Sequence, residues 1–134
     1  MEALPRFQDA VRRDPGSADA RHRLGPALAS RQQRRDAIAE YRATIRLSPN
    51  FADAHDNRAS ALASPGTIAD AVGEVLEAIR LRPECADFSR NAAGVFSKRG
   101  DVAEAMRRLE DALALDPQNV AAQQMLDDLR RRPK

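Results

Sequence analysis

The stretch that decides the fold is residues 37–49, which read AIAEYRATIRLSP. The same pattern of residue types returns 34 positions later, at 71–83 (AVGEVLEAIRLRP), and again at 105–117 (AMRRLEDALALDP). A weaker copy precedes them at 3–15 (ALPRFQDAVRRDP). A fixed period of 20–50 residues is typical of repeat architectures, in which each unit packs only on its neighbours.

Each copy predicts a helix that ends at a proline. Within 37–49 the apolar side chains recur at steps of three and four residues, which places them on one helix face. Pro49 stops the helix, because proline lacks the backbone N–H and restricts the residue before it. The other copies end in the same way, at Pro15, Pro83 and Pro117.

The half of each repeat that precedes this pattern predicts a partner helix. Very small residues recur there at Gly25, Ala59 and Ala93, again 34 positions apart. We expect this column to face the second helix of each hairpin, because small side chains let two helices approach closely. Thr67 and Asp101 resemble the first residues of capping boxes that open the second helices.

These motifs resemble the tetratricopeptide repeat (TPR), whose signature is Trp-x2-Leu-Gly-x2-Tyr, then Ala-x3-Phe, then Pro. The fullest match is Leu24-Gly25-x2-Leu28, Ala37-x3-Tyr41 and Pro49. The resemblance implies an all-α, right-handed superhelix of antiparallel helical hairpins, forming one domain over residues 1–134. We expect a second helix of a partial repeat at 1–17, full repeats at 18–51, 52–85 and 86–119, and a capping helix at 120–134.

Two departures from the signature predict local weakness. The large aromatic residue is absent, and Arg58 replaces a usual leucine, so the helix expected at 52–64 is weakly apolar and should be the least protected. Pro26 lies inside the first expected helix, where proline costs about 3 kcal/mol or forces a kink. We therefore expect a bend or break near Gly25 and Pro26.

The composition argues against a disulfide-bonded protein, a cysteine-based zinc protein and a membrane-spanning protein. Helix-favouring residues dominate, tryptophan is absent, and the net charge is only +2. The single cysteine, Cys85, excludes an internal disulfide and a cysteine-based zinc site. No apolar run approaches the roughly 20 residues of a membrane helix. We expect a cytoplasmic protein that binds no membrane; its preference for arginine over lysine is typical of a GC-rich, bacterial-like genome.

The sequence carries no pattern that predicts catalysis, a metal site or a cofactor. His22 and His55 lie in different repeats without metal-ligand spacing, and no phosphate-binding glycine loop is present. Arginines 34 apart, at Arg12, Arg46 and Arg80, would form a ladder on the convex face. Acidic residues interleave with them, which favours a solvated surface over nucleic-acid binding.

In TPR proteins the first helices of the hairpins line a concave groove that holds a peptide or a partner helix. Mapped by repeat phase, the groove of this chain would carry Asp19, His22, Asp53, Asp56, Asn57, Ser60, Asp87, Arg90, Asn91, Gly94 and Lys98. Asn57 and Asn91 would form an amide column for an extended backbone, or would be repeat consensus without a ligand. The 34-spaced aspartates would form a carboxylate column, or would only complement helix dipoles.

One known TPR specificity does not fit the sequence. The clamp that binds chaperone tail carboxylates needs Lys, Asn, Asn, Lys and Arg at five places. In this chain those places hold His22, Pro26, Asn57, Asp87 and Asn91. Only one agrees, so no chaperone-tail clamp is expected.

Three functions stay open from the sequence. The first is a non-catalytic protein-interaction module or adaptor that binds a peptide or partner helix in the groove. The second is a scaffold that self-assembles into homo-oligomers through its open N-terminal end, around Leu4 and Phe7. The third is a regulatory segment of a larger TPR-bearing enzyme.

Overall fold

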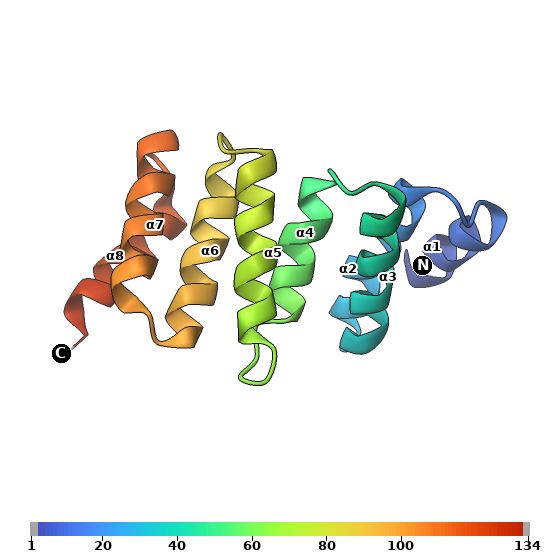
Figure 1. The fold of residues 1–134 in the computed structure, drawn as a ribbon, viewed down its shortest axis with the longest axis horizontal. Helices are drawn as coiled ribbons and strands as arrows, with labels where there is room; N and C mark the ends of the chain where they lie inside the picture. Colours follow the sequence, from blue (N-terminus) through green and yellow to red (C-terminus); the bar gives the residue numbers. More distant parts are fainter. Residues whose placement is uncertain (1–2, 133–134) are drawn as a thin grey trace.

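In the computed structural model, which describes residues 3–132, the chain forms eight α-helices and no strands. Their bounds are α1 Ala3–Arg13, α2 Ala18–Ser30, α3 Arg34–Leu47, α4 Ala52–Ala61, α5 Ile68–Leu81, α6 Ala86–Arg99, α7 Val102–Leu115 and α8 Val120–Arg131. Each helix packs on the next one along the chain, and α4 also contacts both α2 and α6. The helices therefore follow one another along a single axis, with the two termini at opposite ends (Figure 1).

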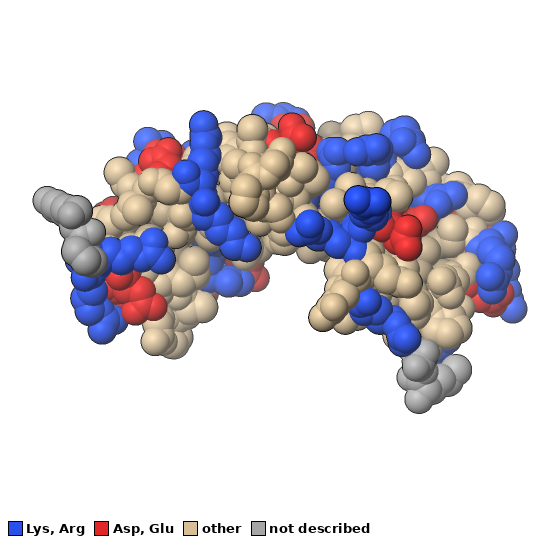
Figure 2. Space-filling view, turned by 90° about the horizontal axis from the view of Figure 1, so that it is seen from below, with Lys and Arg blue, Asp and Glu red and all other residues tan. Residues whose placement is uncertain are grey.

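The stacked hairpins curve into a superhelix. Figure 2 shows the molecule from one edge as an arch with a hollow on one side. The first helices of the hairpins, α2, α4 and α6, contact one another as α2·α4 and α4·α6 and form one layer. The fold is thus an all-α superhelix of antiparallel hairpins, as the sequence predicts.

The core is built from small residues in the repeated columns. Ala37, Ala71 and Ala105 are completely buried, and so are Val75 and Leu109. Gly25, Ala59 and Ala93 are buried too, which confirms that the small column lies inside the hairpins. Because the side chains are short, the helices must approach closely to bury enough apolar surface.

The helix α4 is the polar part of this core. His55 and Arg58 point inward and bind the same carboxylate, with His55 Nδ1 2.9 Å from Glu74 Oε2 and Arg58 Nη1 2.9 Å from Glu74 Oε1. The Nε atom of Arg58 is buried without a hydrogen-bond partner. The helix also ends at Ala61, earlier than the sequence predicts.

Two local features differ from what the sequence predicts. The break expected as one outcome near Gly25 and Pro26 does not occur: α2 runs from Ala18 to Ser30 through Pro26, and Leu24, Gly25 and Leu28 within it are buried. The capping boxes do not form either: Asp101 makes no side-chain cap, and the Thr67 hydroxyl instead donates to the carbonyl oxygen of Leu62 at 2.6 Å.

Candidate functional site

The residues predicted to line the groove come from α2, α4 and α6, and several of them meet at two pockets. A pocket of about 940 Å³ opens between α2, the start of α3, and α4. A smaller pocket of about 180 Å³ lies between α4, α6 and α8. Ser60 lines both, so the two pockets meet at this residue.

The two pockets differ in chemistry. The larger pocket is lined by Pro26, Ala29, Gln32, Gln33, Arg34, Arg35, Asp36, Tyr41, Asn57, Ser60 and Ala61. The smaller pocket is lined by Ser60, Ala63, Arg90, Asn91, Gly94, Val95, Lys98 and Met125. The first therefore has an apolar surface with two arginines, whereas the second is narrow and basic.

The two asparagines of the predicted amide column are engaged between repeats. The Asn57 Nδ2 atom lies 2.9 Å from His22 Nε2, and Asn91 Nδ2 donates to Asp56 Oδ2 at 2.9 Å. Since an amide nitrogen only donates, the Nε2 atom of His22 must be the acceptor. Burial lowers the pKa of His22, which favours the neutral ring that this contact requires.

Asp56 differs from the other predicted groove residues, because it is only 7% exposed. Burial raises the pKa of its carboxyl to about 6, and the hydrogen bond from Asn91 only partly opposes that rise. Its second oxygen, Oδ1, is buried without a hydrogen-bond partner. A carboxylate in this position joins two repeats at a cost in stability.

The predicted column of exposed aspartates is matched by arginines of the same chain. The shortest oxygen–nitrogen distances are 3.0 Å for Asp19–Arg23, 3.7 Å for Asp53–Arg82 and 3.6 Å for Asp87–Arg90. Exposed pairs of this kind contribute little to stability. They do reduce the negative charge that the column would otherwise present to a ligand.

At the N-terminal end, Leu4 and Phe7 are half-buried and pack on the small core of α2 and α3. Ala3 and Ala10 on the same helix are exposed. A cleft of about 540 Å³ separates α1 from α2, lined by Ala3, Leu4, Phe7, His22, Arg23, Pro26, Ala27, Ser30 and Arg31.

Sequence reasoning missed the contribution of residues 32–36 to the larger pocket. Arg34 and Arg35 stand where the later repeats hold Ile68 with Ala69 and Val102 with Ala103. This charged departure from the repeat is the sequence signal for their role. Mapping the groove by the repeat phase of the first helices does not include these residues, because they lie in the turn and at the start of the second helix.

Comparison with known proteins identifies the family. Residues 22–84 and 66–120 match the tetratricopeptide repeat family. The chain belongs to this family. No curated protein matches the sequence significantly.

Solved structures share the fold at low sequence identity. The TPR protein YrrB, described as having an unusual peptide-binding site, is 22% identical, with a TM-score of 0.83 over 93% of this chain. The chain spans 64% of the length of YrrB. A thermophilic TPR protein of Thermus thermophilus, TTC0263, is 19% identical with a TM-score of 0.86, over 96% of this chain and 71% of its own.

A third structure holds a ligand. The first TPR domain of Spaghetti (RPAP3), bound to an HSP90 peptide, is 21% identical with a TM-score of 0.80, over 85% of this chain and 90% of its own. The TPR fold is a protein-interaction fold, and the descriptions of YrrB and of the RPAP3 domain both name a peptide. No helix within residues 3–132 of the present chain has the length and apolar character needed to cross a membrane.

Proposed function

We propose that this chain is a non-catalytic adaptor whose concave groove binds an extended peptide or a partner helix. The observation that carries the proposal is the pair of pockets that meet at Ser60 on the layer of first helices. The larger volume, about 940 Å³, is at the upper end of the range for ligand sites, roughly 300–1,000 Å³. The peptides bound by YrrB and RPAP3, according to their descriptions, support a peptide ligand here.

The chemistry of the groove argues against a chaperone tail as that peptide. His22 is turned to Asn57, and Asp87 is paired with Arg90. These residues stand at clamp places where a lysine is needed, so neither supplies a free positive charge for a terminal carboxylate. We propose an internal segment of a partner protein as the ligand.

Filling the groove at the junction of the pockets should abolish partner binding. Ser60 is exposed and makes no hydrogen bond through its side chain within residues 3–132, so Ser60→Trp should leave the fold intact. We expect affinity capture from a lysate of the source cells, read by mass spectrometry, to recover at least one protein whose yield falls tenfold or more with this variant.

The matched control is Ala103→Trp, an equally exposed change on α7 that lines none of the pockets described above. This control should capture the same protein as the wild type. Equal capture by all three proteins would contradict groove binding and move the interaction to another face. Circular dichroism would confirm that both variants keep their helical content.

Self-assembly is the second candidate, and the exposed side chains of Ala3 and Ala10 on α1 favour it. Phe7 holds the repeat position of Tyr41, which is buried against Gly25 of its own repeat, but Phe7 itself is only half-buried and lines the cleft between α1 and α2. We expect sedimentation velocity at increasing concentration to show a growing mass for the wild type and a constant monomer for Phe7→Glu. A wild-type monomer across the whole range would contradict self-assembly.

A further inference from the structure

The large pocket exists because one junction between repeats is poorly filled. The corresponding space between α4 and α6 is only about 180 Å³, against about 940 Å³ between α2 and α4. The helix α4 ends at Ala61, whereas α6 continues to Arg99, so α4 lacks its last turn here. The walls contributed by α2 and α4 carry only small or medium-sized side chains, Pro26 and Ala29 on one side and Asn57, Ser60 and Ala61 on the other, which leave the gap open.

The lining of this pocket combines an apolar surface with a basic edge. Pro26, Ala29, Ala61 and the buried ring of Tyr41 supply the apolar part. The edge carries Arg34, Arg35 and one acid, Asp36. The excess charge is positive.

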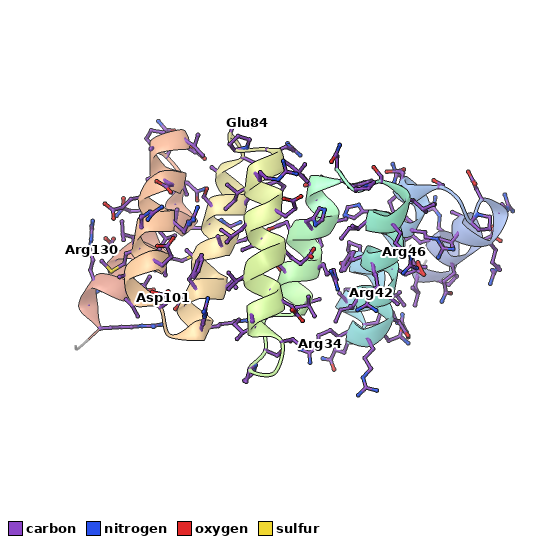
Figure 3. All side chains as sticks on the ribbon, viewed as in Figure 1. Arg34, Arg42, Arg46, Glu84, Asp101 and Arg130 are labelled. Atoms are coloured by element: carbon purple, nitrogen blue, oxygen red, sulfur yellow. The ribbon has the colours of Figure 1, made fainter. Side chains whose placement is uncertain are left out.

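The two arginines differ in how they are held. Arg34 Nη1 donates to Ser64 Oγ at 2.7 Å and so ties the start of α3 to the loop after α4. Figure 3 shows Arg34 at this end of α3, with Arg42 and Arg46 further along the helix. Arg35 is exposed and has no ion pair or hydrogen bond through its side chain among residues 3–132, so its guanidinium is available to an incoming carboxylate.

The backbone conformation of Gln32 is a second observation that indicates a function for this edge of the pocket. This residue adopts φ 60°, the left-handed region that favours glycine, and it lines the pocket. The equivalent positions in the later repeats hold Gly66 and Gly100, and Gly100 has φ 90°. A glutamine here costs about 1 kcal/mol relative to glycine, and such local strain is often kept where a side chain has a function.

We propose that this pocket binds a bulky apolar side chain of the partner peptide together with an adjacent aspartate or glutamate, whose carboxylate pairs with Arg35. The proposal rests on the groove function proposed above and names the chemistry of its ligand. The volume of about 940 Å³ exceeds what one side chain needs, so the pocket also has room for the adjacent acidic residue. The apolar lining favours burial of the apolar side chain of the peptide, and the unpaired guanidinium of Arg35 supplies a charge-assisted hydrogen bond.

Other occupants fit less well. The C-terminal segment of a second copy carries Arg130, Arg131 and Arg132, which have the same charge as the pocket edge. A nucleic acid needs exposed aromatic rings for base stacking, but the one aromatic ring in the pocket, that of Tyr41, is only 3% exposed.

The test is selection of a phage-displayed library of random eight-residue peptides on the wild-type chain. We expect the enriched peptides to share Leu, Met or Phe with Asp or Glu within two positions of it. In fluorescence anisotropy, a labelled enriched peptide should bind at least tenfold more weakly to Ala29→Trp, which fills the pocket, and to Arg35→Glu, which reverses its charge. Replacing the acid of the peptide by its amide should weaken binding to the wild type by a similar factor.

Matched controls separate this pocket from the rest of the protein. Ala103→Trp and Arg42→Glu make the same two exchanges at exposed sites outside the pocket and should bind like the wild type. Since Arg35 lies in the first turn of α3, a glutamate there suits the helix dipole and should not unfold the chain. Peptides that bind equally to Ala29→Trp and Arg35→Glu but not to Ser60→Trp would overturn this inference alone, and a library without enrichment would overturn the groove proposal with it.

Discussion

Replacing Gly25 by alanine is expected to destabilise the protein by about 2–3 kcal/mol, although the same change in an open helix is stabilising. A Cβ atom built on Gly25 would lie 2.2 Å from Cε1 of Tyr41 and 2.7 Å from Cδ1 and Cζ. Tyr41 is only 3% exposed, so its ring can relieve the overlap only by shifting against the buried residues that pack on it. The energetic cost of this overlap therefore exceeds the stabilisation of roughly 0.5–1 kcal/mol that alanine gains over glycine in a helix.

The measurement is urea unfolding followed by circular dichroism, with Gly73→Ala as the matched control. Gly73 lies inside α5 with nothing within 4 Å of an added Cβ atom, so its alanine variant should gain about 0.5–1 kcal/mol. Opposite signs for the two variants isolate the overlap with Tyr41. A Gly25→Ala protein as stable as the wild type would contradict the packing described for this hairpin.

The repeat itself suggests how to rescue the Gly25 variant. By repeat phase, Gly25 and Tyr41 correspond to Ala59 and Val75 and to Ala93 and Leu109. The smallest residue thus stands opposite the largest, and alanine stands opposite aliphatic side chains. We expect Gly25→Ala with Tyr41→Leu to recover most of the lost stability, since contacting sites of complementary volume are coupled.

The 34-residue period was sufficient to predict the fold. The period predicted the helix pairs, the buried column of small residues and the prolines that end the second helices. These features depend only on local periodicity and on the need for small side chains where two helices approach closely. The period could not predict that Pro26 is tolerated within α2. That outcome depends on how strongly Leu24 and Leu28 are held by α3, which is a tertiary effect.

The groove was only partly predictable for a similar reason. Repeat phase places equivalent residues 34 apart in one column, but the polar contacts between repeats join residues 35 apart, His22 with Asn57 and Asp56 with Asn91. The amide column therefore suggested side chains that face a ligand. In the structure these side chains are instead hydrogen-bonded to the neighbouring repeat. The size of the large pocket was not predictable from the repeat, because it depends on the end of α4 at Ala61, although Arg34 and Arg35 at its edge depart from the repeat pattern.

The burial of Asp56 leads to the second large effect, a loss of stability as the pH rises. Burial is the main cause of the raised pKa, about 6 in the folded protein against an ordinary value of 3.8. The neighbouring Asp53 and Asp87 raise it further, while the hydrogen bond from Asn91 and the charge of Arg90 lower it. Between these two values the folded state binds more protons than the unfolded state, so the free energy of unfolding falls with rising pH.

The full difference between these two pKa values corresponds to about 3 kcal/mol of unfolding free energy, which is lost between about pH 4 and pH 7. The Asp56→Asn variant cannot ionise, and its amide oxygen can still accept the hydrogen bond from Asn91. Its stability relative to the wild type should therefore rise by about 3 kcal/mol across this range. At pH 7 the net gain should be smaller, about 1–2 kcal/mol, because one buried amide N–H replaces the unpaired oxygen.

Urea unfolding of both proteins at intervals from pH 4 to pH 8 measures this difference. His22 acts in the opposite direction in the same range, since its lowered pKa makes protonation favour the unfolded state as the pH falls. Both proteins carry His22, so its contribution cancels when their stabilities are subtracted. Parallel curves for wild type and Asp56→Asn would mean that the carboxyl is solvated, and the contact between Asp56 and Asn91 would then not be the buried link between repeats 52–85 and 86–119 that the geometry implies.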